Sequence, residues 1–68
     1  MSTLTELREA RKATIADIAQ EVGADRTAVY KWEQGLAEPR EEFRAAYALA
    51  LRISVRELGA LIYAGSVA

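Results

Sequence analysis

The segment DIAQEVGADRTAVYKWEQG, from Asp17 to Gly35, decides the fold. Two stretches with helical periodicity flank Gly23, and glycine supplies the positive φ that a sharp turn requires. Four positions earlier, Ala19 is small enough to let the two helices approach closely. The apolar residues that we expect to form the core between them are Ile18, Val22, Val29 and Trp32.

The second helix of this segment, residues 25–34, has two different sides. At about 100° per residue, five polar side chains fall within an arc of roughly 140°. They are Arg26, Thr27, Tyr30, Lys31 and Gln34. Val29 and Trp32 point away from the arc, so one side can dock while the other faces outward. Arginine and lysine can bond guanine acceptors, and threonine and tyrosine add hydroxyl or methyl contacts to base edges. This arrangement meets the demands of a helix-turn-helix, whose second helix enters the major groove of DNA.

The composition limits the classes of function. A chain of 68 residues predicts one domain, residues 1–68, with a small core. The net charge of −1 counts against a nucleic-acid binder that relies on bulk positive charge, but not against a locally basic face. Without cysteine or histidine, the sequence offers no disulfide, no usual metal site and no usual general base. We therefore expect that the protein is not an enzyme and that it binds no metal and no cofactor. The absence of a long apolar stretch or an export signal predicts a cytoplasmic protein without membrane association.

The hydrophobic pattern predicts an all-α fold of five helices, because no sustained alternation of strand type occurs. The expected helices cover residues 3–12, 15–22, 25–34, 40–51 and 55–63. The tetrads TLTE (Thr3 to Glu6), TIAD (Thr14 to Asp17) and SVRE (Ser54 to Glu57) match the capping box that begins a helix. Asp25 is expected to cap the third helix, and Gly35 to end it.

The stretch TLTELREARKATIADIAQEVGADRTAVYKWEQGLAEP resembles the Cro/CI-type (lambda-repressor-like, XRE-type) helix-turn-helix family of phage and bacterial regulators. The later LRISVREL resembles the entry to the last helix of that family. The resemblance implies a five-helix, lambda-repressor-like domain that binds operator DNA, usually as a homodimer. It implies base contacts from Arg26, Thr27 and Lys31, with Tyr30 close by. It also implies a structural ion pair between Arg8 and Glu33.

Several residues depart from the family pattern. Ile15 stands where the family commonly has a glutamine that bonds a phosphate, and Lys12 and Arg52 stand at common glycine positions. We therefore expect phosphate contacts from other groups, namely Lys12, Thr14, the amides of the second helix, Gln34 and Arg40. For Arg40, and for Arg44 beside it, a solvated helix face is an equally good interpretation.

The C-terminal third carries more apolar residues than a small monomer can hide. Leu49 and Ile53 lie off the stripe that Phe43 and Tyr47 begin, and LGALIYAG is nearly uncharged. This surplus favours a homodimer through the fifth helix or the end of the fourth. The alternative is a tightly packed terminal helix in a monomer.

Two functions of different class are compatible with these features. The first is a sequence-specific transcriptional regulator, a small Cro-like or repressor-like protein that occupies an operator and needs no small-molecule ligand. The second is a protein-binding adaptor or antitoxin-like partner, in which DNA contact is secondary or lost. A steep dependence of affinity on salt would distinguish the first from the second.

Overall fold

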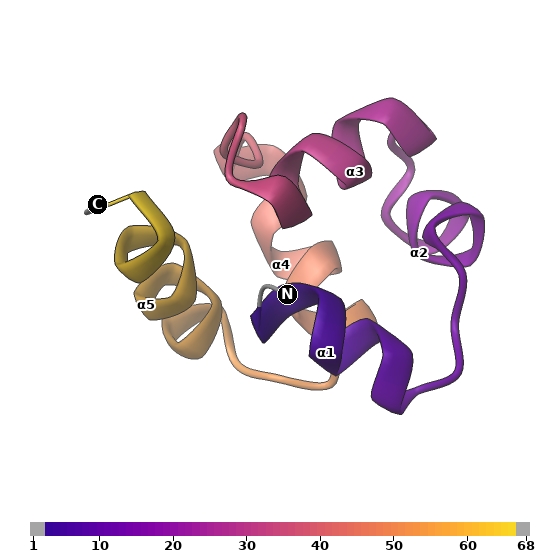
Figure 1. The fold of residues 1–68 in the computed structure, drawn as a ribbon, viewed down its shortest axis with the longest axis horizontal. Coiled ribbons are helices and arrows are strands. Elements are labelled where there is room, and N and C mark those ends of the chain that lie inside the picture. The colour runs from indigo at the N-terminus through magenta and orange to yellow at the C-terminus, as the bar shows by residue number, and fades with distance from the viewer. Residues whose placement is uncertain (1–2, 67–68) are drawn as a thin grey trace.

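The computed structural model describes residues 3–66, with side chains described as far as Ile62. Over this range the backbone forms five helices and no strand (Figure 1). They are α1 (Thr3–Ala10), α2 (Ile15–Val22), α3 (Arg26–Gln34), α4 (Glu41–Leu51) and α5 (Val55–Ser66). The predicted all-α, five-helix fold is confirmed, with α2 and α3 as the helix-turn-helix. None of the helices in the described range is long and apolar enough to cross a membrane.

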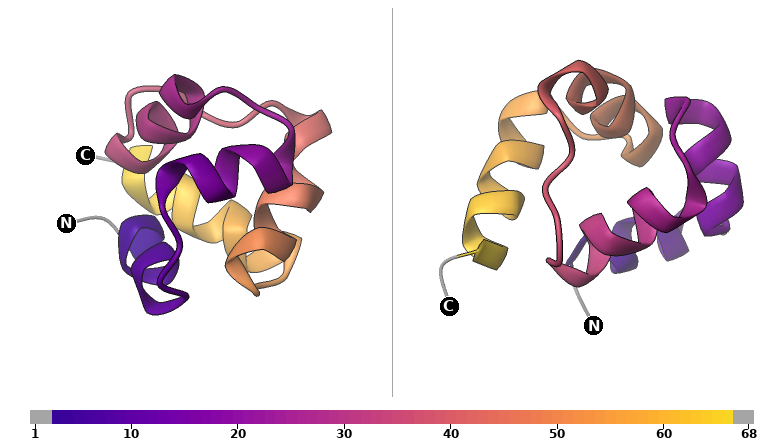
Figure 2. Two further views of the ribbon diagram at one scale, coloured as in Figure 1. Left: turned by 90° about the vertical axis from the view of Figure 1, so that its right-hand side faces the viewer. Right: turned by 90° about the horizontal axis from the view of Figure 1, so that it is seen from above.

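The core forms around α4, which packs against α1, α2 and α5, while α2 also packs against α3. Figure 2 shows the other helices gathered on one side of α4. The buried apolar residues come from all five helices: Leu4, Ile18, Ala19, Val22, Val29, Trp32, Tyr47, Ala48, Ala50, Leu51, Leu58 and Ile62. Because every helix contributes to this one cluster, the orientation of α3 depends on its packing against the rest of the domain.

Two helices begin with the predicted capping boxes. Thr14 accepts a hydrogen bond from the amide of Asp17 at 3.1 Å, and the Asp17 carboxylate accepts one from the Thr14 amide at 2.9 Å. Ser54 and Glu57 repeat the arrangement at α5. α1 begins at Thr3, so its cap position falls on residue 2, outside the described residues. Asp25 occupies the cap position of α3 but makes no capping hydrogen bond through its side chain.

Four helices end in a residue with left-handed backbone conformation. Gly23 ends α2 with φ of 83° and Gly35 ends α3 with φ of 73°, as the sequence predicts. Lys12 and Arg52, with φ of 57° and 63°, do the same after α1 and α4. At each of these ends the following amide reaches back to a carbonyl five residues earlier, as in a Schellman motif. Basic residues thus form the turn at positions 12 and 52, where the resemblance led us to expect glycine.

Four predicted helix boundaries are wrong. α3 begins at Arg26, since Asp25 is its extended cap residue. α1 ends at Ala10, not at residue 12, because the left-handed conformation of Lys12 cannot continue a helix. α4 begins at Glu41, since Arg40 is its extended cap residue. The helical backbone of α5 continues to Ser66, three residues beyond the predicted end.

The apolar surplus of the C-terminal third is mostly absorbed by the core. Leu58 is fully buried, Ile62 is buried, and Ile53 packs against the core although it lies off the Phe43–Tyr47 stripe. Leu49 is different, because 69% of its surface is exposed. The side chains from Tyr63 onward lie outside the described residues.

Candidate nucleic-acid interface

The inner side of α3 is held by an aromatic cluster. Val29 is fully buried and Trp32 is 6% exposed. The ring centroid of Trp32 lies 4.9 Å from that of Tyr47 and 5.9 Å from that of Phe43, both on α4. Tilted pairs at such distances are favourable for aromatic side chains. The tryptophan therefore fixes which side of α3 faces inward.

A buried ion pair fixes the same helix from α1. Glu33 is only 3% exposed, and its carboxylate accepts hydrogen bonds from Arg8 Nε at 2.7 Å and from Thr5 Oγ1 at 2.8 Å. Arg8 also donates to the carbonyl of Ala13, which ties in the turn before α2. The hydrogen bond to Glu33 raises the pKa of Arg8 above its ordinary value. The Arg8–Glu33 ion pair therefore holds α3 in place at a position that the helical wheel marks only as polar.

The outer side of α3 is open to solvent. The five side chains of the predicted arc are all exposed: Arg26, Thr27, Tyr30, Lys31 and Gln34. Among the described residues, no hydrogen bond or ion pair engages these five side chains, so their polar groups are available to a ligand. Figure 1 shows α3 along the upper edge of the molecule with no helix beyond it. We call this arc the α3 outer face.

The candidate phosphate-contacting residues come from different parts of the chain and have different surroundings. Lys12, Thr14, Gln34 and Arg40 are all exposed. The Thr14 hydroxyl already accepts the capping hydrogen bond of α2, and Arg40 makes only a long ion pair of 3.9 Å with Glu42. Arg44 is half-buried and donates from Nε to the carbonyl of Pro39 at 3.1 Å, so it braces the α3–α4 loop.

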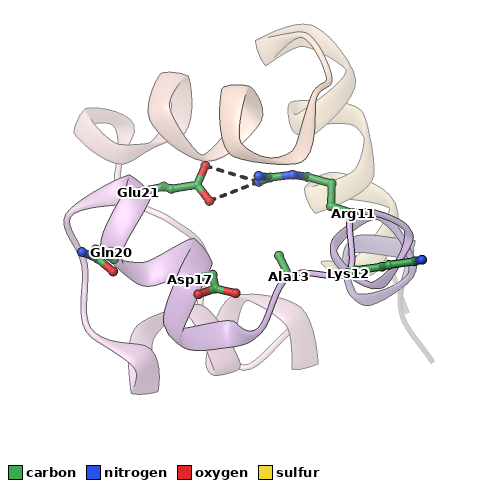
Figure 3. Close-up of a pocket in the computed structure, with 6 residues that line it drawn as sticks. All are labelled: Arg11, Lys12, Ala13, Asp17, Gln20 and Glu21. Carbon is green, nitrogen blue, oxygen red and sulfur yellow. Dashed lines mark hydrogen bonds and ion pairs between the residues drawn. The ribbon is translucent and has the colours of Figure 1, made fainter.

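A shallow hollow lies between the end of α1 and the side of α2 (Figure 3). Its lining residues are Arg11, Lys12, Ala13, Asp17, Gln20 and Glu21. Figure 3 shows Arg11 pointing toward Glu21, with 3.3 Å between guanidinium and carboxylate, while Lys12 points away from both. The Asp17 carboxylate lies at the start of α2, and its hydrogen bonds with Thr14 lower its pKa. This hollow therefore carries both signs of charge.

Two residues that hold the site together carry no signal in the sequence. Thr5 donates to Glu33, and Arg11 donates to the backbone carbonyl of Ala50 on α4 as well as to Glu21. The partners lie 28 and 39 residues away along the chain, so no local pattern indicates them. Within the described residues, no group of histidine, cysteine, aspartate or glutamate side chains is arranged to hold a metal ion.

The match of the chain to a known family agrees with this helix-turn-helix geometry. The model of the helix-turn-helix domain family matches residues 2–61. The chain therefore belongs to this family of DNA-binding domains. No curated protein and no solved structure matches the chain.

Proposed function

We propose that the protein is a sequence-specific transcriptional regulator of the Cro/CI type that places α3 in the major groove of an operator. The observation that carries this proposal is the α3 outer face, whose donors are unpaired while the opposite side of the helix is fixed by Trp32 and Glu33. A rigid helix that presents unpaired donors suits the reading of base edges, because such contacts need defined geometry.

Within this proposal, each exposed residue has a role set by its chemistry. Arg26 and Lys31 bond acceptors on guanine, and Thr27 and Tyr30 lie between them on the same arc. Contacts to the phosphates are assigned to four exposed residues: Lys12, Thr14, Gln34 and Arg40. Such contacts position the domain on the duplex without reading its sequence. The protein acts without catalysis or cofactor, by occupying its site.

The overall charge of −1 makes a second copy useful. Few phosphate contacts give weak non-specific binding, and a homodimer on a near-palindromic site doubles the contacts. Exposed Leu36 and Leu49 instead favour the adaptor or antitoxin-like alternative, in which a protein partner covers them. A salt titration separates the two functions.

The test begins with duplexes selected by the protein from a random-sequence pool and measures affinity by fluorescence anisotropy against salt. For the parent we expect log affinity to fall steeply with log salt. Arg26→Ala should lose about 1–3 kcal/mol and relax preference at one base pair, and Lys31→Ala should behave similarly. Arg56→Ala, which removes an exposed arginine on α5, is the matched control and should leave selectivity unchanged. If Arg26→Ala and Lys31→Ala bind like the parent, α3 does not read DNA.

A further inference from the structure

The outward side of α4 carries an arrangement that the DNA-binding site does not use. Its exposed residues are Glu41, Glu42, Ala45 and Leu49, followed by Arg52 at the end of the helix. At about 100° per residue the four helical residues fall within one arc of roughly 100°, and Arg52 follows it after a left-handed turn. In the left view of Figure 2, α4 forms one edge of the molecule, with no helix beyond it. We call this arc the α4 outer face.

Charge and apolar surface are ordered along the α4 outer face. Glu41 and Glu42 lie in the first turn, and Arg52 lies at the opposite end. Between them are the small Ala45 and Leu49, which is 69% exposed. The guanidinium of Arg52 turns back over this face, donating to the carbonyl of Leu49 at 3.3 Å. The face therefore carries Glu41 and Glu42 at one end, with Arg40 3.9 Å from Glu42, apolar side chains in the middle and Arg52 at the other end.

A surface with this order is complementary to itself when reversed. If two copies of α4 lie antiparallel about a twofold axis near residue 47, Glu41 and Glu42 face the partner's Arg52. In the same register Ala45 faces the partner's Leu49, so a small residue receives a large one. Symmetric interfaces require such self-complementarity, because each contact occurs twice. A single antiparallel register therefore pairs both the charged residues and the apolar residues.

We propose that the α4 outer face is the surface through which two copies of this chain associate. The inference gives the proposed homodimer a defined interface but does not depend on DNA binding. α3 lies on a different side of the molecule from this face, so a dimer through α4 leaves the α3 outer face uncovered (Figures 1 and 2). A contact limited to one side of an 11-residue helix is smaller than a standard interface, so we expect weak, reversible association.

Analytical ultracentrifugation of the full chain, from micromolar to millimolar concentration, measures this association. We expect the parent to show a monomer–dimer equilibrium. Leu49→Glu should weaken association at least tenfold, because it buries a charge opposite Ala45. Leu36→Glu is the matched control, since Leu36 is 70% exposed but lies in the loop after α3. It should associate like the parent.

A charge exchange tests the antiparallel register itself. Glu41→Lys/Glu42→Lys alone and Arg52→Glu alone should each weaken self-association, because like charges then meet at both ends of the pair. A mixture of these two variants should regain dimers, since both ends of a mixed pair again have opposite charges. Far-UV circular dichroism of each variant checks that the helices remain folded.

Three results would overturn the proposal. One is a parent chain that sediments as a monomer over the whole range, which would also remove the proposed homodimer. Another is equal association of Leu49→Glu and Leu36→Glu, which would leave a dimer formed through another surface. The third is a mixture of the charge variants that associates no better than either alone. The reading of base pairs by α3 is tested separately, by the loss of selectivity in Arg26→Ala and Lys31→Ala, so the two proposals fail separately.

Discussion

Arg8 Nε lies 2.7 Å from Glu33 Oε2, and this pair joins α1 to the buried side of α3. Glu33 is almost completely buried and Arg8 is largely so, with side chains 2% and 14% exposed. Thr5 and the carbonyl of Ala13 complete the network. This hydrogen-bond network thus links α3 to α1 and to the turn before α2.

Removing one partner of the Arg8–Glu33 pair should lower the free energy of unfolding, because the other charge is left buried. We expect Glu33→Ala to lower the free energy of unfolding by about 3 kcal/mol in urea titrations followed by circular dichroism. Glu21→Ala removes an acceptor from the more exposed pair with Arg11 and should cost less than about 1 kcal/mol. If Glu33→Ala leaves too little folded protein to measure, the milder Glu33→Gln takes its place. Equal losses for the buried and the exposed pair would contradict the structural role of Glu33.

The Tyr47 hydroxyl is buried beside this pair, and no described protein group bonds it. Burial, followed by the nearby Glu33 charge, raises the pKa of Tyr47 well above its ordinary value of 10.0. When the pH exceeds the ordinary pKa of tyrosine, the unfolded chain loses the Tyr47 proton while the folded chain keeps it. Stability linked to Tyr47 should therefore be complete below about pH 10 and fall as the pH rises further.

Tyr47→Phe isolates this effect, because it keeps the ring packed on Trp32. At neutral pH we expect a free energy of unfolding within about 1 kcal/mol of the parent. Between about pH 9 and about pH 11, the parent should lose up to about 1 kcal/mol more than Tyr47→Phe. Urea titrations at the two pH values measure both. Identical pH profiles would show that the hydroxyl is not held in its neutral form.

The two glycine turns illustrate what could be predicted from the sequence. Gly23 and Gly35 indicate left-handed helix ends directly, and the spacing of Val29 and Trp32 gives the buried side of α3. A Cβ at Gly23 would meet no atom within 4 Å, so its φ of 83°, and not lack of space, favours glycine there. Signals of this kind are local, because one residue type or one helical period is enough to read them.

The features that could not be predicted depend on distant partners or on neutral local signals. Lys12 and Arg52 adopt left-handed conformations, yet neither residue type favours them, so the early end of α1 was missed. Arg11 finds the carbonyl of Ala50 only after α1 and α4 have packed together. Arg44 was expected at a phosphate or in solvent, but its bond to Pro39 depends on the path of the loop. The roles of the α3 residues at DNA remain predictions.

Lys12 combines backbone strain with a proposed phosphate contact. Its φ of 57° is unfavourable for a side chain with Cβ, so Lys12→Gly should raise the free energy of unfolding by about 0.5–1 kcal/mol. The same variant loses a charge, so DNA affinity should fall and the salt slope should decrease by about 1. Lys12→Arg keeps the charge and should preserve the slope. A Lys12→Gly variant that binds DNA like the parent would exclude the phosphate contact.

Asp17 is expected to stabilise the fold but to oppose DNA binding. Its carboxylate completes the capping box of α2, and its pKa is lowered chiefly by the hydrogen bond from the Thr14 amide. A lowered pKa stabilises the fold above the ordinary value of about 3.9, and this contribution disappears as the pH falls through the folded value. Asp17→Asn should therefore be less stable than the parent at neutral pH, and the difference should shrink in acid.

The same substitution should strengthen DNA binding if Lys12 and Thr14 meet a phosphate, because it removes an anion 2.9 Å from the Thr14 amide. Anisotropy titrations at low salt would show the gain, and it should diminish as salt screens the repulsion. Glu57→Gln makes the equivalent change in the capping box of α5 and should leave DNA affinity unchanged. Equal effects of the two substitutions would mean that the start of α2 does not approach the DNA backbone.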